Sequence, residues 1–468
     1  VFPRPGPITT RLAVSIDPPA PGFLGRTVRF ASTSLTFEVR RNKPELISPA
    51  TPTPRELKPL SDIDDQAGLR YLIPVIQFHR RNPKMGDINP ASVIREALAK
   101  LLVFYYPLAG RIKEGPGRKL TVDCTGEGVL FIEAEADVTL EQFGKTLHPP
   151  FPCMEKLICD VPGSNSVIGS PLVQIQVTHL LCGGFIFTSR IYHTVSDGTG
   201  MAQFLMALGE MARGAVTPSV LPVWKRELLC ARDPPLVTFP HPEYDDVGKT
   251  GDNIMTINEM ADKSFFFGPI EMAALRRFVP EHLKSCTTFE VLTACLWRCR
   301  TIALELSPEK DTRLMFFVNA RGKFNPPIPI GYYGNCIVLP CVVARAKDIC
   351  NKPLGFALEL VMKAKSRVNE EYVRSTADLM AVKGRPHYKT DSTYIVSNLT
   401  RVALNKVNFG WGEAIYAGLP KDDQDIPGVF SDYMPSVNDN GESGIIVIIG
   451  LPIPTMEKFV KELKIMLH

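Results

Sequence analysis

Apolar residues recur along this chain with two different periods, and the first is that of a helix. In residues 90–104 apolar positions return every three or four residues after a Pro/Ser start, which predicts an amphipathic helix. The same spacing predicts helices over 201–212, with Gly214 as a stop, and over 455–467. Three amphipathic helices are therefore predicted from the helical period.

A fourth helix is predicted from its start signal. Thr287 is followed three residues later by Glu290, the arrangement of a capping box, and the apolar pattern continues through Trp297. A helix should therefore begin at this threonine.

The second period is that of a strand. Residues 172–178 alternate apolar and polar side chains, Gly183-Gly184 can turn the chain, and 185–193 alternate again, so a β-hairpin is predicted. Period two places on one face of the second strand Phe185, Phe187, Ser189, Ile191 and His193. His193 therefore ends the more apolar face, at a corner between a strand and the helix predicted at 201–212.

Strand-like and helix-like segments alternate without an internal repeat, which indicates a mixed α/β architecture. A length of 468 residues favours two domains, and the Pro-rich, charged stretch 214–262 reads as the crossover between them. We expect an N-terminal domain over 34–213 with His193 and a C-terminal domain over 263–468.

Residues 1–33 differ in composition from the rest of the chain. They hold six prolines, four arginines and a single acid, so we expect them not to fold. An extraneous extension is favoured over an organelle transit peptide because no amphipathic pattern is present.

Composition and charge exclude several classes of function. No apolar run reaches the eighteen or so residues that cross a bilayer, so a soluble protein with no membrane partner is expected. The net charge is only +4, without a basic stripe, which disfavours nucleic acid. Eleven scattered cysteines without a Cys-x-x-Cys pair indicate reduced thiols, a cytoplasmic location and no metal site.

The first motif with chemical potential is His193-Thr-Val-Ser-Asp197-Gly198. Imidazole is the side chain whose ordinary pKa lies near neutrality, so His193 is a candidate base for an alcohol proton. The alternative is structural: His193 as a hydrogen-bonded core residue and Asp197 as the N-cap of the next helix. The motif alone leaves both interpretations open.

Two further motifs lie in the second half of the chain. Asn408-Phe-Gly410-Trp411-Gly412 places glycines beside a large aromatic, and Gly331-Tyr-Tyr-Gly-Asn335 follows Val318-Asn319-Ala-Arg321. Each alone is compatible with an ordinary turn. Together, and in this order, the three motifs resemble the plant BAHD acyltransferases from about residue 35 to the C-terminus.

Other segments narrow the resemblance. Tyr105-Tyr-Pro-Leu-Ala-Gly-Arg111 and Thr288-Phe-Glu-Val-Leu-Thr-Ala-Cys-Leu-Trp297 match the family's habits, and Leu60-Ser-Asp-Ile-Asp-Asp65 is similar to the alcohol acyltransferases that make volatile esters, a group that includes the benzyl alcohol benzoyltransferases. The resemblance implies two similar-sized domains like chloramphenicol acetyltransferase, with mixed β-sheets flanked by helices and an active-site channel between them.

The resemblance also implies roles for individual residues. His193 takes the alcohol proton, and Asp197 turns away to pair with Arg321. Trp411 or a backbone amide donates to the oxyanion. The remaining positions are structural support from Asn408, Gly410 and Gly412, contacts to coenzyme A from Thr287, Thr288, Ser397 and Arg401, and an acceptor pocket formed by Tyr105, Phe187, Thr194 and Gly198. Two positions depart from the family's usual pattern: Asn408 replaces an aspartate and Leu399 a tryptophan.

The predicted function is therefore transfer of an acyl group from acyl-CoA, such as acetyl-CoA or benzoyl-CoA, to a small aliphatic or benzylic alcohol. No bound cofactor is expected, and the protein should be a monomer. Two alternatives are a same-family enzyme for a larger specialised metabolite and a catalytically weak binding protein. A serine hydrolase is disfavoured because Gly-x-Ser-x-Gly is missing. A peptide-synthetase condensation domain is disfavoured because Tyr192 precedes His193 where two histidines are usual.

Overall fold

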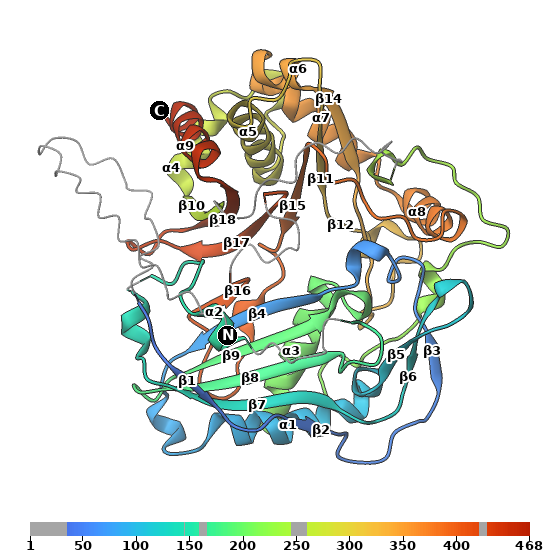
Figure 1. The fold of residues 1–468 in the computed structure, drawn as a ribbon, viewed down its shortest axis with the longest axis vertical. Helices are drawn as coiled ribbons and strands as arrows, with labels where there is room; N and C mark the ends of the chain where they lie inside the picture. The colour runs from blue at the N-terminus through green and yellow to red at the C-terminus, as the bar shows by residue number, and fades with distance from the viewer. Residues whose placement is uncertain (1–34, 145, 159–165, 245–259, 421–427) are drawn as a thin grey trace, which may run out of the picture.

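The computed structural model describes residues 35–144, 146–158, 166–244, 260–420 and 428–468. The predicted extension 1–33 and part of the crossover therefore lie outside the described residues. Within the described ranges the chain forms two sheet-and-helix domains, drawn in Figure 1 with the blue and green elements below and the orange and red elements above.

The N-terminal domain is built on a mixed sheet with seven strands in the described part of the chain. The order along the main path is β1-β7-β8-β9-β4-β16, with β2 on the edge of β7. Strands β7 and β8 are parallel and the other pairs are antiparallel. The strands are β1 (Val39–Arg41), β2 (Glu45–Ile47), β4 (Leu72–His79), β7 (Val129–Ala136), β8 (Val173–Leu180), β9 (Phe185–Tyr192) and β16 (Tyr416–Gly418).

The remaining N-terminal elements are β3 (Leu57–Pro59), β5 (Arg111–Glu114) and β6 (Leu120–Asp123) in a small sheet, with α1 (Pro90–Phe104), α2 (Met154–Leu157) and α3 (Gly198–Ala212). Helix α1 matches the predicted range. It begins where Asn89 accepts the amides of Ala91 and Ser92 through Oδ1, while Pro90 has no amide to satisfy. The predicted hairpin is confirmed as β8 and β9.

The C-terminal domain has a six-stranded sheet within the described residues, ordered β10-β18-β17-β15-β11-β14. Its strands are β10 (Met260–Phe267), β11 (Asp311–Phe316), β14 (Cys341–Arg345), β15 (Thr393–Asn398), β17 (Phe430–Val437) and β18 (Ser443–Pro452), and a separate pair is formed by β12 (Val318–Asn319) and β13 (Ile337–Val338). Its helices are α4 (Pro269–Arg276), α5 (Thr288–Ala303), α6 (Ala346–Asn351), α7 (Leu354–Ser366), α8 (Glu370–Val382) and α9 (Ile453–Leu467).

Three apolar cores hold this arrangement together. One fills the space between the N-terminal sheet and helices α1 and α3, and a second lies between the C-terminal sheet and α5, α7 and α9. A third joins the two sheets: Phe78 and Ile186 of the first pack with Met434 and Ile448 of the second. Helices α1, α3, α5, α7 and α9 therefore cover the outer faces, and the inner faces of the two sheets meet with α2 beside them (Figure 1).

The boundary between the domains differs from the prediction. The sequence pattern assigned all of 263–468 to the C-terminal domain, but β16 pairs with β4, and Leu404, Phe409 and Trp411 pack in the N-terminal core. The physical reason is the free edge of β4, which this returning segment covers with an antiparallel strand.

Residues 232–239 of the crossover are held by one face of α8. Asp378 accepts the backbone amides of Arg232 and Leu236, and Ser375 accepts those of Thr238 and Phe239. Side chains of a helix thus replace the neighbouring strand that an extended segment otherwise needs for its amides.

Candidate active site

His193 follows the last residue of β9 and opens a tight turn that leads into α3. Its amide donates to the carbonyl of Tyr71 at 2.8 Å, and the Tyr71 ring meets the imidazole edge-on with centroids 5.6 Å apart. The residue is 7% exposed. The imidazole therefore lies at a corner braced by a neighbouring segment, in a largely dry environment.

Burial lowers the pKa of His193 below its ordinary value of 6.5. Interactions with its own backbone, with the Asp197 charge, and with Asn335 and Asp64 oppose this shift without cancelling it. The imidazole is therefore neutral at pH 7, the form that accepts a proton.

Asp197 has both of the roles that the motif left open. Its Oδ1 accepts the amide of Gly200 at 3.0 Å, so it caps α3. Both carboxylate oxygens also accept from the guanidinium of Arg321, at 2.7 and 2.9 Å, and Oδ2 accepts the amide of Cys336 at 3.0 Å. This two-bond pair joins the start of α3 to the second half of the chain.

Three residues that the sequence interpretation did not select also hold this turn. Nδ2 of Asn335 donates to the carbonyl of His193 at 2.6 Å, and Arg226 donates to the carbonyl of Val195 at 2.8 Å. Oδ1 of Asp64 accepts from both Asn335 Nδ2, at 2.9 Å, and Arg226, at 2.8 Å. Asp64 and Asn335 lie in segments that carried the resemblance, whereas no sequence signal identifies Arg226.

The segment Asn408–Gly412 lies at the other end of β9. Trp411 packs edge-on against Phe185, the first residue of that strand, with ring centroids 5.5 Å apart. His193 follows the last residue, about 25 Å away at the usual rise of a strand. The structure does not bring Trp411 to His193, so the oxyanion role expected of it is corrected to a packing role.

Asn408 organises its own turn. Its Oδ1 accepts the amides of Gly410, at 2.8 Å, and Gly412, at 3.1 Å, and both glycines have positive φ. The backbone of Asn408 also approaches α3 closely, because a Cβ on Gly209 would lie 2.7 Å from its carbonyl oxygen. The motif therefore fastens the returning segment to the helix that follows the histidine.

The four acceptor-pocket candidates separate into two pairs. Tyr105 and Phe187 are fully buried in the N-terminal core, where Tyr105 accepts from Gln203 at 2.9 Å and Phe187 packs on Phe409. Thr194 and Gly198 belong to the histidine loop. A Cβ on Gly198 would lie 3.4 Å from Leu399, so the position where a tryptophan is usual faces the start of α3. Only this second pair adjoins His193.

The coenzyme A candidates all belong to the C-terminal domain. Thr287 caps α5 by accepting the amide of Glu290. Phe289, one residue after Thr288, packs on Tyr433, which is paired in the sheet with Asn398, the neighbour of Ser397. Thr288 and Ser397 are thus drawn to one end of this sheet, while Arg401 is exposed in the turn beyond β15.

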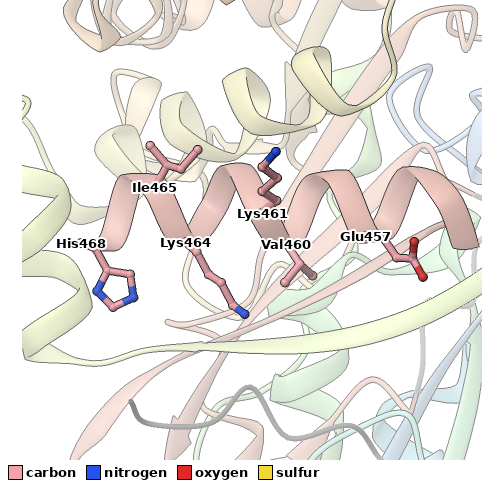
Figure 2. Close-up of a pocket in the computed structure, with 6 residues that line it drawn as sticks. All are labelled: Glu457, Val460, Lys461, Lys464, Ile465 and His468. Carbon is pink, nitrogen blue, oxygen red and sulfur yellow. The ribbon is translucent and has the colours of Figure 1, made fainter. Parts of the chain in front are cut away.

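Two hollows differ in their relation to this site. One, of about 420 Å³, lies along α9 (Figure 2), and it is lined by residues of that helix and by His468, which follows it: Glu457, Val460, Lys461, Lys464, Ile465 and His468. A narrow crevice of about 10 Å³ instead lies between the domains and is lined by Gln66, Gly68, Leu69, Phe317, Ile337, Val338, Leu339 and Tyr388. Only the crevice combines both halves of the chain near Tyr71, so the α9 hollow is not a candidate for the reaction.

Two further findings concern the described residues as a whole. None of their helices combines the length and apolarity needed to cross a membrane. The ten cysteines that the structure describes are all free.

The chain is similar to known proteins over most of its length. A model described as the Transferase family matches residues 37–466. Benzyl alcohol O-benzoyltransferase of Petunia hybrida is 59% identical over 437 residues, covering 93% of this chain and 95% of the relative. 13-hydroxylupanine O-tigloyltransferase of Lupinus albus is 52% identical over 438 residues, with 92% and 95% covered. Alcohol acyl transferase 1 (allele GSa) of Malus domestica is 52% identical over 435 residues, with 92% and 94% covered.

Solved structures share the fold. Vinorine synthase superposes with a TM-score of 0.70 at 22% identity, covering 92% of this chain and 98% of that one. TRI101 of F. sporotrichioides, complexed with coenzyme A and T-2, superposes with a TM-score of 0.63 at 17% identity, covering 87% and 97%. The expected two-domain α/β architecture is therefore confirmed.

Proposed function

The chain belongs to the Transferase family, the BAHD acyltransferases, and from this membership we propose that it is an acyl-CoA-dependent alcohol O-acyltransferase for small benzylic or aliphatic alcohols. The observation that carries the proposal is the neutral, buried but not sealed His193 at the junction of two domains. The proposed acceptor class follows the relatives, one of which is named for benzyl alcohol.

In the proposed reaction Nε2 of His193 takes the hydroxyl proton as the alcohol oxygen attacks the thioester carbonyl. A tetrahedral intermediate forms, its C–S bond breaks, and the leaving thiolate of coenzyme A recovers the proton from the imidazolium. The products are an ester and free coenzyme A, so atoms and charge balance without an acyl-enzyme. The two substrates are proposed to meet in a channel between the domains, with Thr287, Thr288, Ser397 and Arg401 toward coenzyme A.

The oxyanion donor is proposed to be a backbone amide of the site rather than Trp411. Backbone amides are fixed in direction by their loop, and a preorganised donor stabilises charge that develops in the transition state. Asp197 and Arg321 serve as structural support of the histidine loop, as their contacts suggest.

To test the proposed function, purified protein is incubated with a panel of acyl-CoAs and alcohols, and the esters formed are detected by headspace analysis. Benzoyl-CoA, acetyl-CoA and tigloyl-CoA are each paired with benzyl alcohol and with a short aliphatic alcohol. His193→Ala should lower kcat/KM by roughly 10²–10⁴-fold, the usual contribution of a positioned base. Undiminished ester formation in that variant would contradict the mechanism.

The matched control is His282→Ala. This histidine is exposed and pairs with Glu359 on the surface of the C-terminal domain. Its replacement should leave ester formation unchanged, so a loss in both variants would indicate a general effect of removing an imidazole.

A larger acceptor is the second candidate. A relative with 52% identity is named for 13-hydroxylupanine and a tigloyl group. A polycyclic alcohol with tigloyl-CoA therefore belongs in the panel, and preference for it over benzyl alcohol would favour this candidate. Binding of acyl-CoA without turnover by any acceptor would favour the third candidate, a binding protein.

We further propose that the enzyme acts as a monomer in the cytoplasm. The groups proposed for proton transfer and its support all come from one chain. Free cysteines such as Cys295 and Cys336 suit a reducing compartment.

A further inference from the structure

Three polar side chains meet at the turn that carries His193: those of Asp64, Arg226 and Asn335. The backbone carbonyls of His193 and Val195 each accept a side-chain donor there, Asn335 Nδ2 at 2.6 Å and Arg226 at 2.8 Å, and the His193 carbonyl also accepts the amide of Ser196 at 3.3 Å. Asp64 accepts from both donors and also takes the backbone amide of Asn335 at 2.9 Å. Three segments far apart in the sequence therefore converge on one turn of backbone, His193–Val195.

From this convergence we propose that Asp64, Arg226 and Asn335 form a positioning network that sets the orientation of the His193 imidazole. The inference rests on the proposed function of His193 as the base. It assigns roles to three residues that do not themselves touch the reacting atoms.

Burial makes this network rigid. Asp64 and Asn335 are 0% exposed and Arg226 is 1% exposed. A buried arginine beside a buried aspartate is held tightly because separating either from its partner leaves an uncompensated charge away from water. The Arg226 guanidinium also lies over the rings of Trp224 and Tyr333, at 4.5 and 5.1 Å from their centroids.

Two buried polar atoms near this turn, one that can donate a hydrogen bond and one that can only accept, have no assigned partner in the part of the chain that the structure describes. Nδ1 of His193 and Oδ1 of Asn335 are both buried, and neither has a hydrogen-bond partner among the described residues. Nδ1 of a neutral imidazole can carry the proton, and an amide oxygen can only accept. Both side chains belong to the same cluster, since Asn335 Nδ2 donates to the His193 carbonyl at 2.6 Å, and an acceptor for a proton on Nδ1 would leave Nε2 free to act as the base.

The electrostatic surroundings support the same assignment. Asn335 and Asp64 both raise the pKa of His193 against the lowering effect of burial. The charged and titratable groups around the turn are Asp64, Asp197, Arg226, Arg321, Tyr71, Tyr332, Tyr333 and Cys336. Removing either Asn335 or Asp64 should therefore make His193 a weaker base as well as a less well-oriented one.

The test compares Asn335→Ala and Asp64→Asn with the parent protein, using benzoyl-CoA and benzyl alcohol or the best pair in the panel. We expect kcat to fall roughly 10²-fold, the scale of a misplacement near 1 Å, while KM for both substrates changes less than about threefold. The acid limb of the kcat/KM profile should move to lower pH, because each variant removes a group that raises the His193 pKa. If Asn335 and Asp64 had a purely structural role, the maximal kcat/KM would fall and the acid limb would stay at the same pH.

The matched control is Asp65→Asn. Asp65 adjoins Asp64, is also 0% exposed, and is also ion-paired, with Arg385 and Arg70 at 2.6 and 2.9 Å. None of its contacts reaches residues 193–197, so this variant should lose stability and keep kcat within about twofold with an unmoved acid limb.

Arg226→Lys keeps the test open if Asp64→Asn fails to fold. A lysine retains the charge for Asp64 but lacks the fork that reaches the carbonyl of Val195 at the same time, so an intermediate kcat is expected. Ester formation by the unaltered protein in the same assay separates the two hypotheses. If the unaltered protein forms no ester, the proposed function fails. If it does, the positioning role fails when Asn335→Ala keeps its kcat or when Asp65→Asn loses as much kcat as Asp64→Asn.

Discussion

At the scale of single residues, the proposed role of His193 as a base sets two opposing requirements. A base must be neutral, which burial favours by lowering its pKa, but it must also retain enough proton affinity to remove a hydroxyl proton. Asp197 supplies part of that affinity across the turn while it caps α3 and binds Arg321. One carboxylate therefore serves the helix, the domain junction and the imidazole.

The first prediction concerns pH. Because the neutral imidazole is the active form and its pKa is lowered from 6.5, kcat/KM should stay level down to pH 6.5 and fall only as the pH drops through the lowered value. A pH–rate profile with an ester-forming pair measures this limb. A midpoint above 6.5 would contradict the environment described for His193.

The second prediction concerns close packing at Gly200, in the first turn of α3. A Cβ there would lie 1.9 Å from the carbonyl oxygen of Tyr333, so backbone has to move. Gly200→Ala should cost about 1–3 kcal/mol or more in unfolding free energy, measured by urea denaturation. Gly115→Ala is the control: its Cβ meets nothing closer than 3.6 Å, and a change within about 0.5 kcal/mol is expected.

At the scale of elements, the helix starts were readable because they depend on neighbouring residues. Thr287 and Glu290 make the capping-box contacts that their spacing predicts, and the structure adds Asn89 as the cap before Pro90. Helix α3 begins at Gly198, three residues before the predicted 201, because Asp197 rather than the apolar stripe sets its first turn. At α3, therefore, the capping residue marks the start of the helix better than the apolar period does.

The third prediction concerns the turn after Asn408. Only Oδ1 of this side chain binds the turn's amides, so Asn408→Asp keeps both acceptor contacts and should change stability and kcat/KM little. Asn408→Ala removes them and should cost about 1–3 kcal/mol. Thermal or urea unfolding of the two variants measures the difference, and equal losses would show that the side-chain oxygen does not hold this turn.

At the scale of the whole molecule, the two domains are joined by more than the crossover. Residues from 402 to 418 leave the C-terminal half, pack in the N-terminal core and add β16 to its sheet. Arg321 binds Asp197, and Arg385 binds Asp65, across the junction. Separating the domains would expose apolar surface and buried charge together.

The fourth prediction follows from that coupling: both domains should unfold in one transition. Trp297 is buried in the C-terminal core and Trp411 in the N-terminal core, and the third tryptophan is Trp224. Two variants each keep one tryptophan, Trp297 or Trp411, and have the other tryptophans changed to Phe. In each variant the urea midpoint measured by fluorescence should equal the midpoint measured by circular dichroism. Two separated fluorescence midpoints would show that the domains unfold independently.

The sequence alone was enough to predict the local structure and to propose His193 as the base. Period and capping chemistry act between residues a few positions apart, so α1, the β8–β9 hairpin and the corner at His193 followed from them, and the family resemblance pointed to Arg321 as the partner of Asp197. Which side chains lie beside His193 depends on the tertiary structure. Asp64, Arg226 and Asn335 are separated from His193 by 129, 33 and 142 positions, and no local spacing encodes contacts of that range. The position of Trp411 also depends on contacts between distant segments. The pairing of β16 with β4 brings it to Phe185, at the far end of β9 from His193.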